Sequence, residues 1–343
     1  MNRYYMILVF FLIIPIMQSC IMTTTGKPAK RSDPLIGQII ESKTGRPVDF
    51  QALIDHIATY DVIYLSEKHD NPDQHAFQQK VIQALVEKGI TPSIGFEFFS
   101  MDNTPDLLNF IDSGQISHSP ENETFIEKEL RMKLGWHDQS DTMWQYYYDL
   151  LKLAKTKKLA VAGIDLSSAL KKRITRKGID SITPIEKELI FSTSLPDNVY
   201  KEHMFSIFKA VHCGMSHDRM QSRLYDTWVA RNDKMALSIT QMHTHGNGPV
   251  VVIVGGGHTE YNLGIIDRVS TINKQIRQVN IALTEITVNP SPLSDYLFPL
   301  DLKGYDATPP ADFLWFTQRV SYENPCEKFK QSLEKMKAQT PEK

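Results

Sequence analysis

The sequence lacks several motifs that would identify its chemistry directly. It contains no GxSxG nucleophile elbow, no HExxH metal motif, no GxGxxG fingerprint and no GxxxxGK(S/T) phosphate loop. These absences disfavour ordinary serine hydrolase and zincin chemistry and weaken the case for a dinucleotide-binding domain. The formal net charge is −2 and no long Lys/Arg block occurs, so we expect no nucleic-acid partner.

Only one apolar run opens the chain, the twelve residues MILVFFLIIPIM. It is too short to span a bilayer but suits the core of a signal peptide. Ser19 and Cys20 follow it as in a bacterial lipobox, which predicts a lipoprotein signal peptide at residues 1–19 and lipidation of Cys20. The next residue is Ile21 and not Asp, so we expect anchoring through Cys20 in a lipid bilayer of the bacterial cell envelope, at the outer membrane rather than the inner. The alternative is an ordinary signal peptide with a chance cysteine.

Cysteine is scarce, with three in 343 residues. If Cys20 carries lipid, Cys213 and Cys326 remain. An oxidising compartment would permit a disulfide between them, but their distance cannot be read from sequence. We expect two free thiols.

The rest of the chain divides into a tether, one domain and a tail. Residues 20–46 carry the lipidated cysteine and a polar, Pro- and Gly-containing stretch that predicts a flexible tether. Residues 47–320 alternate short apolar runs with helical patterns, which predicts a single α/β domain with a mostly parallel central sheet flanked by helices, and helical insertions forming a lid. Residues 321–343 form a charged C-terminal tail. The expected strands are DVIYLS, PSIGFEFF, LAVAGIDL, PVVVIVGGGH, QVNIALTEI and DFLWFTQ.

Ionisable side chains follow four of these strands. Glu67 and His69 follow the first, Glu97 ends the second, Asp165 ends the third and His258 follows the fourth. In open parallel sheets, ligands bind in the crevice outside the carboxyl ends of the strands. The alternatives are structural, because Glu67 could cap the next helix and Asp165 could cap the helix SSALKKR.

Two further stretches suggest ligand contact. Three glycines precede His258 and could let backbone N–H groups approach a ligand closely. The segment WHDQSDTMWQYYYDLL is so aromatic that some rings could line a groove for a flat apolar ligand, although a satellite core is an equal alternative. His75, on the first turn of its helix, is either a ligand or a solvated residue.

Taken together, several motifs resemble those of ChaN-like lipoproteins, the haem-binding-uptake branch of the Tiki/erythromycin-esterase-like superfamily. They are SEKHDNPDQH, IGFEFF, RNDKMA, VVIVGGGHTEYNLGI and ADFLWFT, and they extend from about residue 50 to 318. The resemblance implies an α/β domain that binds haem and assists iron acquisition, with an outer-membrane iron or haem receptor and a homodimer enclosing haem as possible assemblies. A tyrosine is associated with haem iron in that family, and the candidates here are Tyr146, Tyr147, Tyr148 and Tyr261. The cofactor-binding residues expected from the resemblance are His69, His75, Tyr147, Arg231, His258 and Tyr261.

The wider superfamily also implies an alternative function. It carries two GxxH motifs, and some members are metal-dependent hydrolases. The second motif is intact here at residues 255–258, but Ser66 replaces the glycine of the first, which we expect to change backbone freedom at that turn. Arg231 matches a superfamily helix and could pair with Glu97 or with a haem propionate. The alternative is therefore a Tiki-like peptidase or esterase in which a divalent metal polarises a carbonyl or activates water; its metal and catalytic residues would be Glu67, His69, Glu97 and His258. Whether the protein is an enzyme stays open at this point.

Overall fold

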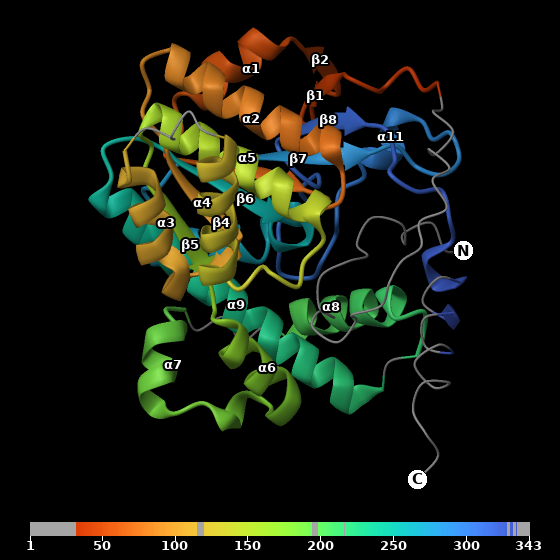
Figure 1. Ribbon diagram of the computed structural model, residues 1–343. Coiled ribbons are helices and arrows are strands. Elements are labelled where there is room, and N and C mark those ends of the chain that lie inside the picture. Colours follow the sequence, from red (N-terminus) through yellow and green to blue (C-terminus); the bar gives the residue numbers. More distant parts are fainter. Residues whose placement is uncertain are drawn as a thin grey trace.

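The computed structural model describes residues 32–114, 120–193, 198–215 and 217–327, with residues 330, 331 and 334. An eight-stranded sheet runs through the molecule in the order β2-β1-β8-β7-β3-β6-β4-β5 (Figure 1). Six strands are parallel to one another, and the two N-terminal strands pair antiparallel at one edge. The predicted α/β domain with a mostly parallel sheet is confirmed. The strands are β1 (Ile39–Glu41), β2 (Arg46–Val48), β3 (Val62–Glu67), β4 (Ser93–Ser100), β5 (Val161–Asp165), β6 (Val250–Gly255), β7 (Gln278–Glu285) and β8 (Phe313–Thr317).

Helices cover both faces of this sheet (Figure 1). They are α1 (Phe50–Ile57), α2 (Pro72–Glu87), α3 (Thr104–Asp112), α4 (Pro120–Lys133), α5 (Asp141–Lys157), α6 (Ser168–Lys177), α7 (Pro184–Ile190), α8 (Asn198–Val211), α9 (Asp218–His245), α10 (Ile265–Ile272) and α11 (Leu293–Tyr296). The predicted start of α2 is confirmed, because the Asn71 side chain accepts hydrogen bonds from the first-turn N–H groups and Pro72 opens the helix. Among the described residues, no helix has both the length and the apolar character needed to cross a bilayer.

Alternation along β3 explains why helices are needed on both sides. Ile63 and Leu65 pack into the core shared with α1, α2 and α5. Val62 and Tyr64 point the other way, into the core shared with α9 and α10. All four side chains are fully buried, as expected for a central parallel strand.

The register of the strands aligns their carboxyl ends. Glu67 at the end of β3 pairs with Gly255 at the end of β6. On the other side of β6, Phe96 of β4 pairs with Ile253. The pairing of β4 with β5 shifts between Phe96 and Ser100, an irregularity that re-aims the residues after Phe96. The polar residues that follow these strands therefore meet at one rim.

One expectation about the chain ends is corrected. Strand β1 lies inside residues 20–46 and β2 begins at Arg46, so the folded domain begins before the boundary that we placed at residue 47. Each strand has only three residues, too short for an alternation pattern, and the buried Ile39 and Ile40 gain their partner only when β8 lies beside them. The signal peptide and Cys20 lie outside the described residues.

The two remaining cysteines form a disulfide, so the expectation of free thiols is wrong. Cys213, just after α8, and Cys326 in the C-terminal segment have Cα atoms 5.6 Å apart, well inside the range that a disulfide requires. The chain around Cys326 thus lies next to the end of α8, although 113 residues separate the two cysteines in the sequence. That proximity is a property of the fold and leaves no trace in the local sequence.

Candidate functional site

The predicted strand-end residues do come together, and the first group forms around the Glu67 carboxylate. His69 Nδ1 lies 2.8 Å from Glu67 Oε1, and the Tyr147 hydroxyl donates to the same oxygen. The Gln78 side-chain amide donates to Oε2, and His75 Nδ1 lies 3.4 Å from it. Strand β3, helix α2 and helix α5 thus each contribute to one closed cluster.

His75 supports this cluster from behind, so it is neither the solvated residue nor the ligand that we considered. Its Nε2 lies 2.9 Å from the carbonyl oxygen of His69, and its Nδ1 lies 3.1 Å from the amide oxygen of Gln78. Both ring nitrogens therefore face oxygen atoms of the protein, which hold the ring in place beside Glu67. The ring also stacks on Tyr146, with 4.5 Å between centroids, and is 1% exposed.

Charge balance in the cluster follows from these contacts. Burial raises the pKa of Glu67, but the charges of His75 and His69 and the hydrogen bonds from His69 and Tyr147 outweigh it, so the pKa lies below its ordinary value. Burial and the Glu67 charge raise the pKa of Tyr147 well above its ordinary value. Tyr147 is therefore a protonated donor to Glu67 in this structure.

A second group forms around Glu97 at the end of β4. Arg231 Nη2 lies 2.5 Å from Glu97 Oε1, and the backbone N–H of Gly255 donates to Oε2 at 2.6 Å. The same guanidinium binds Asp165, with Nε 3.0 Å from Oδ2, and Lys171 lies 2.7 Å from that oxygen. The expected pairing of Arg231 with Glu97 is confirmed. Asp165 belongs to this ion-pair group, and Ser167 caps α6 in its place.

Strong charge pairing also sets the pKa values in the second group. Burial raises the pKa of Glu97, but His258 and Arg231 outweigh it and hold the pKa well below the ordinary value. Burial also raises the pKa of Asp165, but the charges of Arg231 and Lys171 outweigh it and bring the pKa below the ordinary value. Both carboxylates are therefore ionised and compensated inside the protein.

His258 closes this second group. Its Nδ1 lies 2.5 Å from Asn232 Oδ1, and the ring stacks on Trp228 with 4.0 Å between centroids. Burial lowers the pKa of His258. Its Nε2 lies 3.3 Å from Glu97 Oε1 without the alignment of a hydrogen bond, and it is one of the few buried polar atoms of the described chain without such a bond.

Gly255 joins the two groups. A Cβ atom at this position would lie 2.7 Å from His69 Nε2 and 3.3 Å from Glu97 Oε2, both closer than ordinary packing allows. The glycine of the second GxxH motif is therefore needed for the close approach of the two carboxylate groups.

The joined groups do not fit a divalent metal. The carboxylate oxygens of Glu67 and Glu97 already accept from Tyr147, Gln78, Arg231 and the Gly255 N–H. Among the described residues, no set of three or more His, Cys, Asp or Glu side chains is placed to hold a metal ion. Glu67, His69, Glu97 and His258 are between 2% and 5% exposed. We call these joined groups the buried charge network.

Ser66 does not lie at a turn, so our expectation that it changes backbone freedom there is wrong. It is a buried strand residue, paired with Val254 and Ala282, and not part of a turn. Its hydroxyl lies 2.6 Å from the Thr259 hydroxyl and donates to Asn280 Oδ1 at 2.7 Å. Ser66 therefore fastens the residue after His258 to the neighbouring strand.

The aromatic segment 136–148 is core and not an open groove. Trp136, Trp144, Tyr147 and Tyr148 are between 0% and 7% exposed and pack with the sheet. These rings are therefore buried, as in the core alternative, but they belong to the main core of the sheet and not to a satellite cluster.

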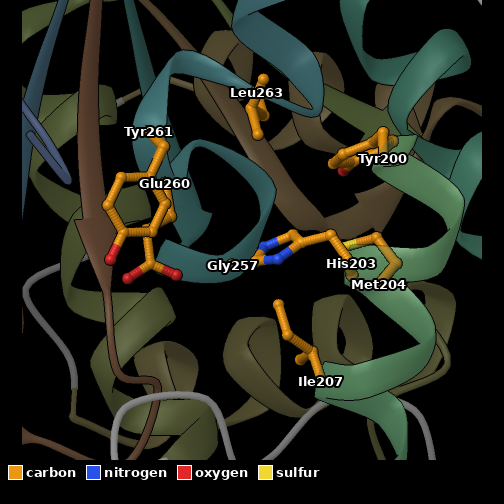
Figure 2. A pocket seen from close by; sticks show the side chains of 8 residues that line it. All are labelled: Tyr200, His203, Met204, Ile207, Gly257, Glu260, Tyr261 and Leu263. Atoms are coloured by element: carbon orange, nitrogen blue, oxygen red, sulfur yellow. The ribbon is translucent and has the colours of Figure 1, made fainter. Parts of the chain in front are cut away.

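Tyr261, one of the predicted cofactor ligands, lies at a cavity between α8 and the turn at residues 256–263. Its backbone is left-handed (φ 59°) and its N–H donates to the carbonyl of Pro310 at 2.9 Å. Figure 2 shows the His203 imidazole pointing from α8 toward Gly257, with Glu260 and Tyr261 on the opposite side. The cavity volume is about 10 Å³, and we call this site the α8 pocket; its lining residues are Tyr200, His203, Met204, Ile207, Gly257, Glu260, Tyr261 and Leu263.

Among the described residues, no partner balances the burial of Glu260 and His203 in the α8 pocket. Burial raises the pKa of Glu260 to about 7, and it lowers the pKa of His203. Both groups are thus held toward their neutral forms. Our sequence reading missed His203, although its position among Tyr200, Met204 and Ile207 on one helix face was a usable signal.

The pocket and the buried charge network are connected by two contacts. The Tyr200 hydroxyl, at the pocket, accepts a hydrogen bond from Trp228 Nε1 at 2.9 Å. The Trp228 ring in turn stacks on His258. Helix α9 therefore places one side chain between the two regions.

Comparison with known proteins identifies the family. The family profile described as "Haem-binding uptake, Tiki superfamily, ChaN" matches residues 53–269, more than half of the chain. This chain belongs to the ChaN family. A solved structure titled "Cofacial heme binding to ChaN of Campylobacter jejuni" shares the fold, with 18% identity, a TM-score of 0.58, and coverage of 81% of this chain and 95% of that one.

More distant solved structures are also similar to this ChaN-family chain. An erythromycin esterase in its open conformation is 14% identical, with a TM-score of 0.40 and coverage of 80% of this chain and 83% of that one. The type III effector HopBA1 is 14% identical, with a TM-score of 0.38 and coverage of 84% and 99%. No curated protein sequence matches this chain significantly.

Proposed function

We propose that this ChaN-family protein binds haem at the α8 pocket and serves in haem or iron acquisition. The observation that carries the proposal is the burial of His203 and Glu260 beside Tyr261, which no charge or hydrogen bond among the described residues balances. A site that awaits a ligand is expected to hold such groups. The buried charge network offers a ligand no such opening, since its groups already satisfy one another.

The residues of the pocket fit the chemistry of haem. Haem brings a ferric iron whose axial position is commonly filled by His or Tyr. A neutral His203 imidazole keeps a lone pair that can bind iron, and the Tyr261 oxygen can do so as a phenolate. Met204, Ile207 and Leu263 add the apolar surface that a porphyrin edge prefers. We therefore place His203 and Tyr261 at the iron and the apolar side chains against the ring.

The size of the pocket limits how haem can bind. A cavity of about 10 Å³ admits roughly one water molecule, so one chain cannot enclose a porphyrin. Haem would lie against the surface and leave its other face open. A second copy of the chain covering that face is the arrangement that we propose, in keeping with the cofacial haem groups named for the Campylobacter jejuni protein.

Haemin titration followed by absorbance tests this site. We expect a Soret shift that saturates near one haem per chain, and a loss of affinity of about 10–100-fold in His203→Ala and in Tyr261→Phe. His243→Ala, a partly buried histidine at the far end of α9, is the matched control and should bind as the wild type does. No Soret shift in the wild-type protein would refute the proposal, and equal losses in all three variants would show that binding is not at this pocket.

The place of the protein in the cell is a second part of the proposal. The apolar run and the small residue before Cys20 favour a lipid-anchored protein of the outer membrane, where an iron or haem receptor is a fitting partner. Labelling growing cells with radioactive palmitate tests the anchor. We expect label in the wild type and none in Cys20→Ala; label in both would refute lipidation at Cys20.

A further inference from the structure

Helices α6 and α7 form a hairpin that exposes two apolar side chains. Ile185 is 70% exposed and Leu189 is 60% exposed. The two residues are four positions apart on α7, so they lie on one side of the helix. Figure 1 shows the hairpin below α9, away from the sheet. We call the segment 168–191 the α6–α7 hairpin.

The hairpin is firmly held, so this exposure does not result from a loose segment. Ile174, Ile182 and Ile190 are between 0% and 4% exposed and form a small core under the two helices. Lys234 of α9 donates to the carbonyl of Leu189 at 2.9 Å, at the end of α7. The apolar pair is therefore presented on a fixed support.

The same hairpin is strongly basic. It contains six Lys/Arg and three Asp/Glu residues, a net charge of +3 in a chain whose formal net charge is −2. Arg173 forms an ion pair with Glu186 that links α6 to α7. Lys171 pairs with Asp165, and the other four cations are exposed: Lys172, Arg176, Lys177 and Lys187.

Helical periodicity places the charges next to the apolar pair. Arg176 and Lys177 follow Arg173 by three and four positions, so they lie on the side of α6 that meets α7. Leu189 follows Glu186 by three positions, so it lies on the side of α7 that meets α6. The Arg173–Glu186 ion pair thus brings exposed cations and an exposed apolar residue to one surface.

We propose that the α6–α7 hairpin is a membrane-contact surface for a bilayer that contains anionic lipid. Apolar side chains that project from a basic helix insert at the boundary between headgroups and acyl chains, while the cations bind the anionic headgroups. Both features are present here on one rigid support. This contact is independent of haem binding, and it would fix the orientation of the domain on the membrane.

Vesicle co-sedimentation tests the proposal. The protein would begin at residue 20 and carry Cys20→Ala, which removes the lipid but keeps every described element. We expect binding to vesicles of phosphatidylcholine with phosphatidylglycerol, weaker binding to phosphatidylcholine alone, and a decline with added salt. The double variant Ile185→Asp/Leu189→Asp should bind on the order of tenfold more weakly. The triple variant Lys172→Glu/Arg176→Glu/Lys177→Glu should lose a similar factor and its salt dependence.

The control is a second exposed apolar pair on a less basic helix. Phe125 and Met132 of α4 are 67% and 66% exposed, so Phe125→Asp/Met132→Asp matches the first variant in chemistry and exposure. It should bind vesicles as the wild type does. Haemin titration of each variant confirms that the fold is intact. The proposal is overturned if the wild-type protein does not bind anionic vesicles, as expected if the hairpin contacts another protein, or if the α4 variant loses as much binding as the hairpin variant.

Discussion

The buried charge network and the α8 pocket hold the same kinds of side chain in opposite electrostatic states. In the network, burial is outweighed by partners, so the pKa values of Glu67, Glu97 and Asp165 are lowered. In the pocket, burial acts with little opposition, so the pKa of Glu260 rises to about 7 and that of His203 falls. The ionisable groups of the network are paired with one another, whereas Glu260 and His203 in the pocket are held toward their neutral forms.

This difference is the reason that we propose the pocket and not the network as the ligand site. The strand-end residues carry the chemistry that a sequence reader notices first, but they bind one another. The pocket carries fewer ionisable groups, and among the described residues no charge or hydrogen bond offsets the effect of burial on the pKa values of Glu260 and His203. Residues that await a ligand are recognised by what fails to compensate their desolvation and not by how many ionisable groups gather.

The largest effect should come from opening the buried charge network. Arg231→Met leaves Glu97 and Asp165 buried without their shared cation, which should destabilise the protein by about 3–5 kcal/mol. Urea denaturation measures the loss. The exposed pair Lys88–Asp55, at 2.5 Å, is the control, because Asp55→Ala should leave stability nearly unchanged. Equal effects of the two variants would show that the network is solvated and not closed.

Removing the disulfide should have the next largest effect, and it acts beside the pocket. Cys213 follows α8, which lines the pocket, and the bond closes a loop across 113 residues. Cys213→Ser with Cys326→Ser should lower stability by about 2–4 kcal/mol. Denaturation of the wild type with and without reductant gives the same comparison without a substitution. A reductant effect that persists in the double variant would place the sensitive bond elsewhere.

Gly255→Ala tests the close approach of the Glu67 group to the Glu97 group. The added methyl would meet His69 Nε2 at 2.7 Å, and such overpacking destabilises by about 1–3 kcal/mol. Gly37→Ala is not a suitable control because its φ is 84°, whereas Gly256→Ala meets no atom closer than 3.8 Å. We expect Gly256→Ala to lose clearly less stability in thermal melts; the reverse order would mean that His69 moves aside freely.

The smallest effect should be a change in how stability depends on pH. Glu260 has a folded pKa of about 7 against an ordinary value of 4.5, so the folded state binds more protons than the unfolded state between these values. Stability should therefore fall as pH rises from 4.5 to 7. The side chain is partly exposed, so we expect a contribution of only about 1 kcal/mol. Glu260→Gln should flatten this slope in melts across the range, whereas Glu202→Gln, an exposed neighbour, should not.

The sequence predicted the central sheet because β3 and β6 are continuous apolar runs, which only strands buried on both faces require. It also predicted that Glu67, Glu97 and His258 converge, because parallel strands end at one rim. It could not show that these groups satisfy one another, since Arg231 and Tyr147 reach them from distant helices. Periodicity likewise left open whether Tyr147 faces a ligand or the core.

The pocket was beyond sequence reasoning for a different reason. His203 and Tyr261 lie on separate elements that approach each other only because α8 packs against α9. The same limit applies to the disulfide and to β1 and β2, whose partners are far along the chain. Local patterns predict elements and strand ends, but which distant segments meet depends on packing of the whole domain.

The pairing of β1 with β8 has a consequence for how the chain is made. Ile39 lies opposite Trp315, so β1 can pair with the rest of the sheet only after β8 has been synthesised. During synthesis, β1 and β7 each present an open row of N–H and C=O groups until β8 slots between them. A product that ends before residue 313 would leave the edges of β1 and β7 unpaired and should aggregate. A stable domain therefore requires that synthesis reach β8.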